Sequence, residues 1–160
     1  MKTIMSLLAV FAMAVFTSPA FSQDPAPAPA PDRAPIAAPD EPTLTSVEVK
    51  FDTTTDNKNP DSLLDVYIKT NHGHEIAKSE GNRGVWNNNS THTLILEVEG
   101  VRTKEQVRDG SMLLTFHPHG ADRWDFNYKV TLKFSDDSVI NRDFEGCQLT
   151  QHDATRTDSL

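Results

Sequence analysis

Six aspartates flank two segments whose composition is typical of loops. Carboxylates from loops at one end of a β-fold can converge on Ca²⁺, whose flexible oxygen coordination tolerates loop ligands. The alternative is that they cap their own turns, as Asp commonly does, and the D-x3-D-x4-D-x3-D spacing of the first four matches no EF-hand loop. Ca²⁺ is therefore the candidate cofactor, and turn capping is the alternative role for these aspartates. The six are Asp52, Asp56, Asp61, Asp65, Asp122 and Asp125.

Two H-x-H pairs, His72/His74 and His117/His119, form a second set of candidate ligands. In an extended segment, residues two apart project to one side, so each pair can present both rings to one metal ion. Imidazole pairs suit Zn²⁺ and Cu²⁺. Neither pair has a Cys or Glu at ligand spacing, and both lie in expected turns. Solvated loop histidines are the alternative explanation.

A third candidate site is the polar loop that contains Arg83, Trp86, Asn87 and Asn88. An exposed aromatic ring flanked by amides can stack on a sugar or anchor a partner. The alternative is that Trp86 folds back and closes the end of the fold. These four residues are the candidate binding residues.

Nucleophilic catalysis is not indicated by the sequence. A nucleophile needs a neighbouring base, but no G-x-S-x-G motif is present, and Cys147 belongs to an apolar strand pattern that predicts a half-buried thiol. Two aspartates could still converge as a hydrolytic pair. We therefore expect no enzyme activity and keep a small secreted hydrolase as a distant alternative.

Strands must position these candidate residues. The clearest strand pattern is segment 124–134 (WDFNYKVTLKF), in which apolar and polar residues alternate strictly. A period of two predicts a strand with one buried face, and the length of the run predicts a bend or bulge. Further strand patterns occupy 47–51, 64–68, 74–78, 94–98, 112–116 and 139–149, and the only helical candidate is 103–107. Short strands at this spacing predict an all-β fold, an antiparallel β-sandwich of about seven to eight strands.

The chain divides into four expected parts. Residues 1–22 have the positive start, short apolar core and small-residue cleavage site of a signal peptide. Residues 23–42 are a Pro/Ala-rich linker, which favours extended polyproline II. The sandwich domain is expected at 43–150 and a frayed polar tail at 151–160. The protein is thus expected to be exported, periplasmic or secreted, with no transmembrane segment after signal cleavage.

The charge balance and the cysteine content limit the classes of partner and the disulfides that we expect. Without Lys2, the chain has 14 Lys and Arg residues against 23 Asp and Glu, a net charge near −9. Such a balance opposes phosphate backbones, so nucleic acid is not an expected partner. A single Cys cannot form an internal disulfide, although an intermolecular one stays open.

Residues 47–54 (VEVKFDTT) and 64–68 (LDVYI) look like the opening hairpin of PLAT/LH2 (lipoxygenase-homology) or C2-like domains. Asp122-Arg123-Trp124 and then 130–132 (VTL) resemble the tryptophan and the following strand of that family. The family's Gly-rich turn and Gly-Thr-Asp are replaced here by Ser62-Leu63-Leu64-Asp65. The resemblance implies an eight-stranded, non-catalytic sandwich that binds proteins or membrane interfaces, sometimes with Ca²⁺, here at Asp52 and Asp65.

These observations predict an exported, non-catalytic binding module that recognises a protein, a glycan or an envelope surface. The loops at 52–65, 81–90 and 118–125 are its expected contact region. The alternative is a periplasmic transition-metal-binding protein that uses the two H-x-H pairs.

Overall fold

The structure is a computed structural model that describes residues 41–160. The expected signal peptide and all but two residues of the expected linker lie outside these residues, so both stay predictions. The described part contains eight strands and one short helix. The elements are β1 (Leu44–Thr53), β2 (Leu63–Lys69), β3 (Glu75–Asn82), β4 (Thr91–Val98), α1 (Lys104–Arg108), β5 (Ser111–His117), β6 (Arg123–Phe134), β7 (Val139–Thr150) and β8 (Thr155–Ser159).

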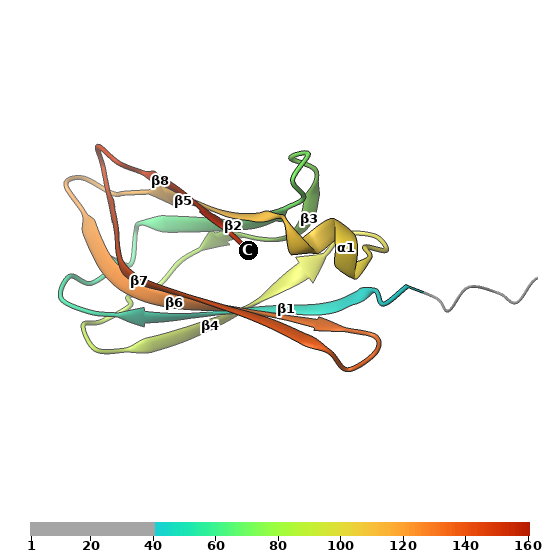
Figure 1. Cartoon of the computed structure of the whole chain (residues 1–160). Helices are drawn as coiled ribbons and strands as arrows, with labels where there is room; N and C mark the ends of the chain where they lie inside the picture. The colour runs from blue at the N-terminus through green and yellow to red at the C-terminus, as the bar shows by residue number, and fades with distance from the viewer. Residues whose placement is uncertain (1–40) are drawn as a thin grey trace, which may run out of the picture. The chain divides into compact units, whose positions relative to one another are not determined.

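The strands form one antiparallel sheet in the order β7-β6-β1-β4-β3-β2-β5-β8. The sheet folds over, so that the half containing β6 and β1 faces the half containing β2 and β5 (Figure 1). Strand β4 joins the halves: it pairs with β1 over six residues but with β3 only through Val98 and Glu97. The all-β antiparallel prediction is confirmed. The two layers are halves of one continuous sheet instead of two separate sheets.

Strand β6 provides the longest part of the core. Its inward residues, from Trp124 to Phe134, are all buried, and they alternate with polar residues on the outer face. This burial is what the period of two requires, because successive strand residues face opposite sides. The apolar residues of β1 pack on the same core, where the Phe51 ring lies 5.4 Å from the Trp124 ring.

A β-bulge interrupts the pairing of β6 with β7. Phe126 pairs with Cys147, but Tyr128 pairs with Phe144, so β7 carries the extra residue. Gly146 adopts a φ of +62° there, and its N–H donates to the Asn127 side chain at 2.7 Å. The expected irregularity is therefore present, but the additional residue belongs to the neighbouring strand.

The expected frayed tail is wrong. Residues 155–159 form β8, which pairs with β5 over five residues, and Leu160 is buried. A backbone hydrogen bond of 3.0 Å from Leu160 to the Gly110 carbonyl holds the end of the chain. The polar composition reflects an edge strand, in which polar side chains face solvent.

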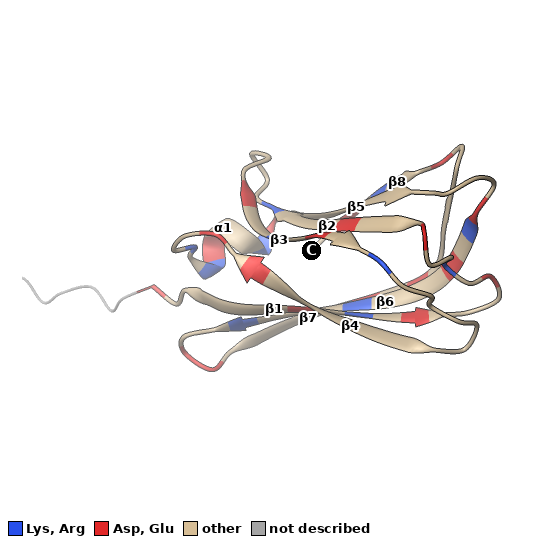
Figure 2. Cartoon of the chain, turned by 180° about the vertical axis from the view of Figure 1, so that it is seen from behind, with Lys and Arg blue, Asp and Glu red and all other residues tan. Residues whose placement is uncertain are grey.

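The expected helical turn is present as α1. Thr103 caps it, and Thr103 and Gln106 form a reciprocal capping box that satisfies two backbone donors. Figure 2 shows acidic and basic residues interspersed over both layers and the loops at both ends. No helix within residues 41–160 combines the length and the apolar character that crossing a membrane requires.

Candidate functional site

Three loops meet at one end of the sheet, which we call the loop end: 54–62 between β1 and β2, 83–90 between β3 and β4, and 118–122 between β5 and β6. Lys58 and Trp86 form an isolated antiparallel bridge between the first two loops, with N–H···O distances of 3.2 and 3.1 Å. The Gly84 N–H donates to the Pro60 carbonyl at 3.4 Å. The first two loops therefore support each other through their backbones.

Asp122 attaches the third loop to the first. Its buried carboxylate accepts hydrogen bonds from the Ser62 hydroxyl at 2.6 Å and the Asn59 N–H at 3.2 Å. The Ser62 hydroxyl oxygen also accepts from the His119 N–H at 2.9 Å. Buried polar groups in native proteins usually have hydrogen-bond partners, because a buried donor or acceptor without a partner costs stability. Asp122 is thus a structural link instead of an exposed ligand.

Lys58 is fully buried between the first two loops. Its Nζ donates to the Gly84 carbonyl at 3.0 Å and lies 5.2 Å from the centre of a Trp86 ring. Burial lowers the pKa of Lys58 to about 8, while the nearby Asp122 carboxylate acts in the opposite direction. The lysine joins two loops and faces an aromatic surface instead of solvent.

Trp86 is buried, so the expectation of an exposed ring is wrong. Only 4% of the residue is accessible. Its ring stacks on His92 with centroids 4.8 Å apart and meets Trp124 edge-on at 5.0 Å. The alternative weighed from the sequence, a tryptophan that closes the end of the fold, describes the structure. Partial burial of His92 lowers its pKa by desolvation, and the nearby charge of Lys58 lowers it further.

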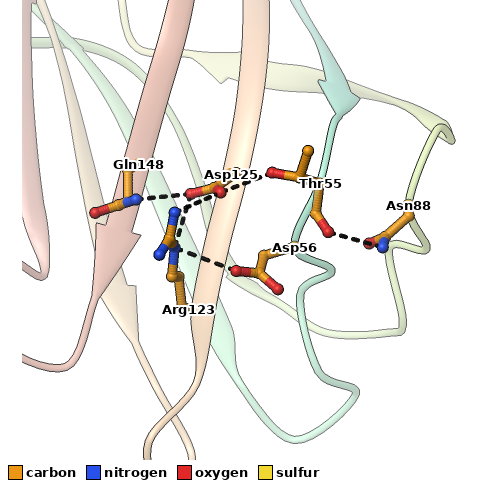
Figure 3. Close-up of polar contacts among 6 residues, drawn as sticks. All are labelled: Thr55, Asp56, Asn88, Arg123, Asp125 and Gln148. Carbon is orange, nitrogen blue, oxygen red and sulfur yellow. Dashed lines mark hydrogen bonds and ion pairs between the residues drawn. The ribbon is translucent and has the colours of Figure 1, made fainter.

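The other three candidate binding residues are exposed at the loop end: Arg83, Asn87 and Asn88. Asn88 donates to the Thr55 carbonyl at 2.8 Å, which ties its loop to the first loop (Figure 3). Val85, which is 41% exposed, lies between these polar residues in the sequence. The loop end therefore presents amides, a guanidinium and one aliphatic side chain.

Arg123 organises a second part of the loop end (Figure 3). Its guanidinium lies 3.2 Å from Asp56 and 2.8 Å from Asp125. Asp125 also accepts from Thr55 at 2.8 Å and from Gln148 at 2.9 Å. The hydrogen bond from Arg123 is the main reason that the pKa of Asp125 lies below its usual value. Both carboxylates are therefore paired with this one arginine, whose single positive charge offsets one of the two negative charges.

A shallow pocket of about 260 Å³ lies beside this cluster, lined by Thr55, Asp125, Cys147 and Gln148 among others. Cys147 is 2% exposed, and burial raises the pKa of its thiol. A thiol that is protonated at neutral pH is a poor nucleophile.

The remaining Ca²⁺ candidates have separate positions. Asp52 bonds to Thr91 and Lys50 on the outer face of the sheet. Asp65 belongs to the other half, where it lies 2.8 Å from His117 and accepts from the Gly81 N–H at 2.6 Å. Asp61 is exposed. Among residues 41–160, no three His, Cys, Asp or Glu side chains cluster closely enough to hold a metal ion.

The two H-x-H pairs lie at opposite ends of β2. His117 pairs with Leu63 at the first residue of β2, whereas His72 and His74 belong to the turn that follows Lys69. At about 3.3 Å per residue, the length of β2 separates the pairs by roughly 20 Å. They cannot form one four-histidine site.

Two residues that shape the loop end, Lys58 and Ser62, were not singled out from the sequence. Lys58 stands among Asn, Asp and Pro, a context typical of a solvated loop. The nearest sequence signal for the role of Lys58 is Trp86, a large ring in a polar loop that another residue must cover if the ring is to be buried. No protein-family model matches the chain, and no curated protein matches its sequence.

Proposed function

We propose that the protein is an exported, non-catalytic binding module that recognises a protein partner through its loop end. The observation that carries the proposal is the mutual support of three loops by Lys58, Trp86 and Asp122. Loops held in one arrangement lose less conformational entropy on binding, which favours recognition. The resemblance to PLAT/LH2 domains implies the same kind of role.

The chemistry of the exposed residues favours a protein partner over a glycan. Sugar recognition commonly relies on an exposed aromatic ring, but Trp86 is buried and the large hydrophobic residues exposed in the described part are all aliphatic. Arg83, Asn87 and Asn88 offer hydrogen bonds, and Val85 offers a small apolar contact. This mixture resembles the polar, adaptable contacts of protein recognition surfaces.

A non-catalytic role agrees with the state of the two strongest nucleophile candidates. Cys147 is held as a thiol by burial, and the Lys58 ammonium is enclosed between two loops. Ca²⁺ is not required by this proposal, because Asp56 and Asp125 already have Arg123 as an ion-pair partner. The ion stays a candidate that the experiment below includes.

A photo-crosslinking amino acid placed at position 83 or 87 of the full chain tests the proposal. The variants are produced in the source organism and irradiated with and without a chelator. We expect one discrete protein adduct from either position. The matched control carries the crosslinker at exposed Arg108 in α1, at the far end of the sheet, and should give no adduct.

The same adduct from position 108, or none from 83 and 87, would contradict the proposal. Loss of the adduct in chelator would add a divalent cation to the recognition. Glycan adducts in place of a protein adduct would replace the proposed partner class.

A further inference from the structure

A polar pocket of about 360 Å³ lies at the end of the sheet opposite the loop end, between the β2–β3 turn and α1. The turn itself is well ordered by Thr70, whose hydroxyl accepts from two backbone N–H groups at 3.3 and 3.2 Å. The pocket thus has one wall fixed by a hydrogen-bonded turn and another by a capped helix. The lining residues that matter here are Thr70, His72, His74, Arg102, Glu105 and Asp109.

Arg102 is the unusual member of this pocket. Its Nη2 donates to the Glu75 carbonyl at 3.4 Å, but its Nε is buried and has no hydrogen-bond partner within residues 41–160. A buried donor without an acceptor is rare in native proteins and costs stability. The guanidinium also has no carboxylate partner in the described part. A carboxylate is the ligand that suits an arginine without an ion-pair partner.

Two carboxylates of the same pocket, Glu105 and Asp109, are exposed and form no ion pair with any described residue. They repel a multiply charged anion such as phosphate and attract an ammonium group. The pocket therefore combines an unpartnered cation and unpartnered anions, and a ligand that carries both charges complements it.

We propose that this pocket binds a small zwitterion, an α-amino acid or a dipeptide. The ligand carboxylate bonds to the Arg102 guanidinium, and its ammonium group lies against Glu105 and Asp109. A volume of about 360 Å³ is at the lower end of the range for small-molecule pockets, which suits a ligand of this size. This site is separate from the loop end, so it does not depend on the protein partner proposed above.

Titration calorimetry on the full chain tests this assignment, with L-alanyl-L-alanine and L-alanine as the probes and with acetate, ethylammonium and inorganic phosphate for comparison. We expect saturable one-to-one binding of the dipeptide. Acetate and ethylammonium, which each satisfy one charge, should bind more weakly, and phosphate should not bind.

Three variants locate the site. Arg102→Gln should weaken dipeptide binding by about tenfold or more, because hydrogen bonds to a charged group are strong. Glu105→Gln combined with Asp109→Asn alters only exposed residues, so it should preserve folding and weaken dipeptide binding. It should not weaken acetate binding, because it removes two negative charges that repel an anion. Arg108→Gln changes an exposed arginine of the same helix and should change nothing.

Several results would overturn the inference. These are an absence of binding by alanine and the dipeptide alike, tighter binding of phosphate than of the dipeptide, or an unchanged affinity in both the Arg102 variant and the Glu105/Asp109 variant. Arg83→Ala, at the loop end, should retain dipeptide binding, so a failure of this site is distinguishable from a failure of the proposed protein recognition.

Discussion

Lys58 and Trp86 pair with each other twice, through reciprocal backbone hydrogen bonds of 3.2 and 3.1 Å and through the lysine ammonium, 5.2 Å from the centre of the tryptophan ring. Each residue explains the burial of the other. The ring covers the lysine, and the lysine holds together the two loops that enclose the ring. This pair is the structural centre of the loop end.

Removal of the Lys58 side chain should destabilise the protein. Lys58→Ala leaves the Gly84 carbonyl without its donor and opens a cavity beside Trp86, so we expect the free energy of unfolding to fall by about 2 kcal/mol or more. Urea unfolding measures this change. Lys133→Ala, at an exposed position of β6, should stay within about 0.5 kcal/mol of the parent. An equally small effect of Lys58→Ala would refute the structural role of the lysine.

Lys58 should also produce a pH dependence of stability. Its folded-state pKa of about 8 lies below the ordinary 10.5, so between these values the unfolded chain binds more protons than the folded one. The contribution of Lys58 to the free energy of unfolding therefore rises with pH across that window and is flat below it. We expect a gain of about 1–3 kcal/mol.

The difference between the parent and Lys58→Met isolates this contribution, because all other titrating groups are shared. Unfolding at several pH values from 7 to 10.5 provides the curve. A constant difference would mean that Lys58 titrates alike in the folded and unfolded chains.

The link between Ser62 and Asp122 should behave as a coupled pair. Ser62→Ala removes a hydrogen bond of 2.6 Å to a buried carboxylate and should cost about 1–3 kcal/mol. A double-mutant cycle with Asp122→Asn should give a coupling energy of about 0.5 kcal/mol or more. Additive effects would show that the two residues act separately. Ser159→Ala, exposed in β8, is the matched control.

The bulge at Gly146 should depend on backbone conformation alone. A Cβ added to this residue would meet no atom within 4 Å, but its φ of +62° disfavours other residues. Gly146→Ala should therefore cost about 1–2 kcal/mol, and Gly146→Asn should cost less because Asn tolerates this region. Thermal unfolding compares the two. Equal losses would indicate a steric cause in place of the backbone one.

The features that could be predicted from the sequence are those with a periodic pattern. The strict alternation of residues 124–134 predicts β6 and the burial of Trp124, and each of the other expected strand ranges overlaps a strand. Strand β8 has no apolar alternation. It forms because β5 offers a backbone edge and because Asp158 bonds to the Tyr128 hydroxyl across the fold. Neither cause is visible in a local pattern.

In the candidate site as well, the position of the loops could be predicted from the sequence, but the contacts of individual residues could not. The three loops expected to form the contact region do meet, because the antiparallel strand order brings them to one end. What each residue does there depends on its spatial neighbours. Trp86 is buried because Lys58 and His92 cover it, and Asp122 is buried because Ser62 satisfies it. The Lys58–Trp86 and Ser62–Asp122 pairings join residues 28 and 60 positions apart, beyond the reach of composition or spacing.

Hydrogen–deuterium exchange of the full chain, with and without the protein captured by the crosslinker, tests the loop-end proposal most directly. We predict that the partner slows exchange in residues 54–61 and 83–90, and that it leaves the β2–β3 turn and α1 unchanged. Protection confined to that turn, to α1 or to the outer faces of the sheet would contradict recognition through the loop end.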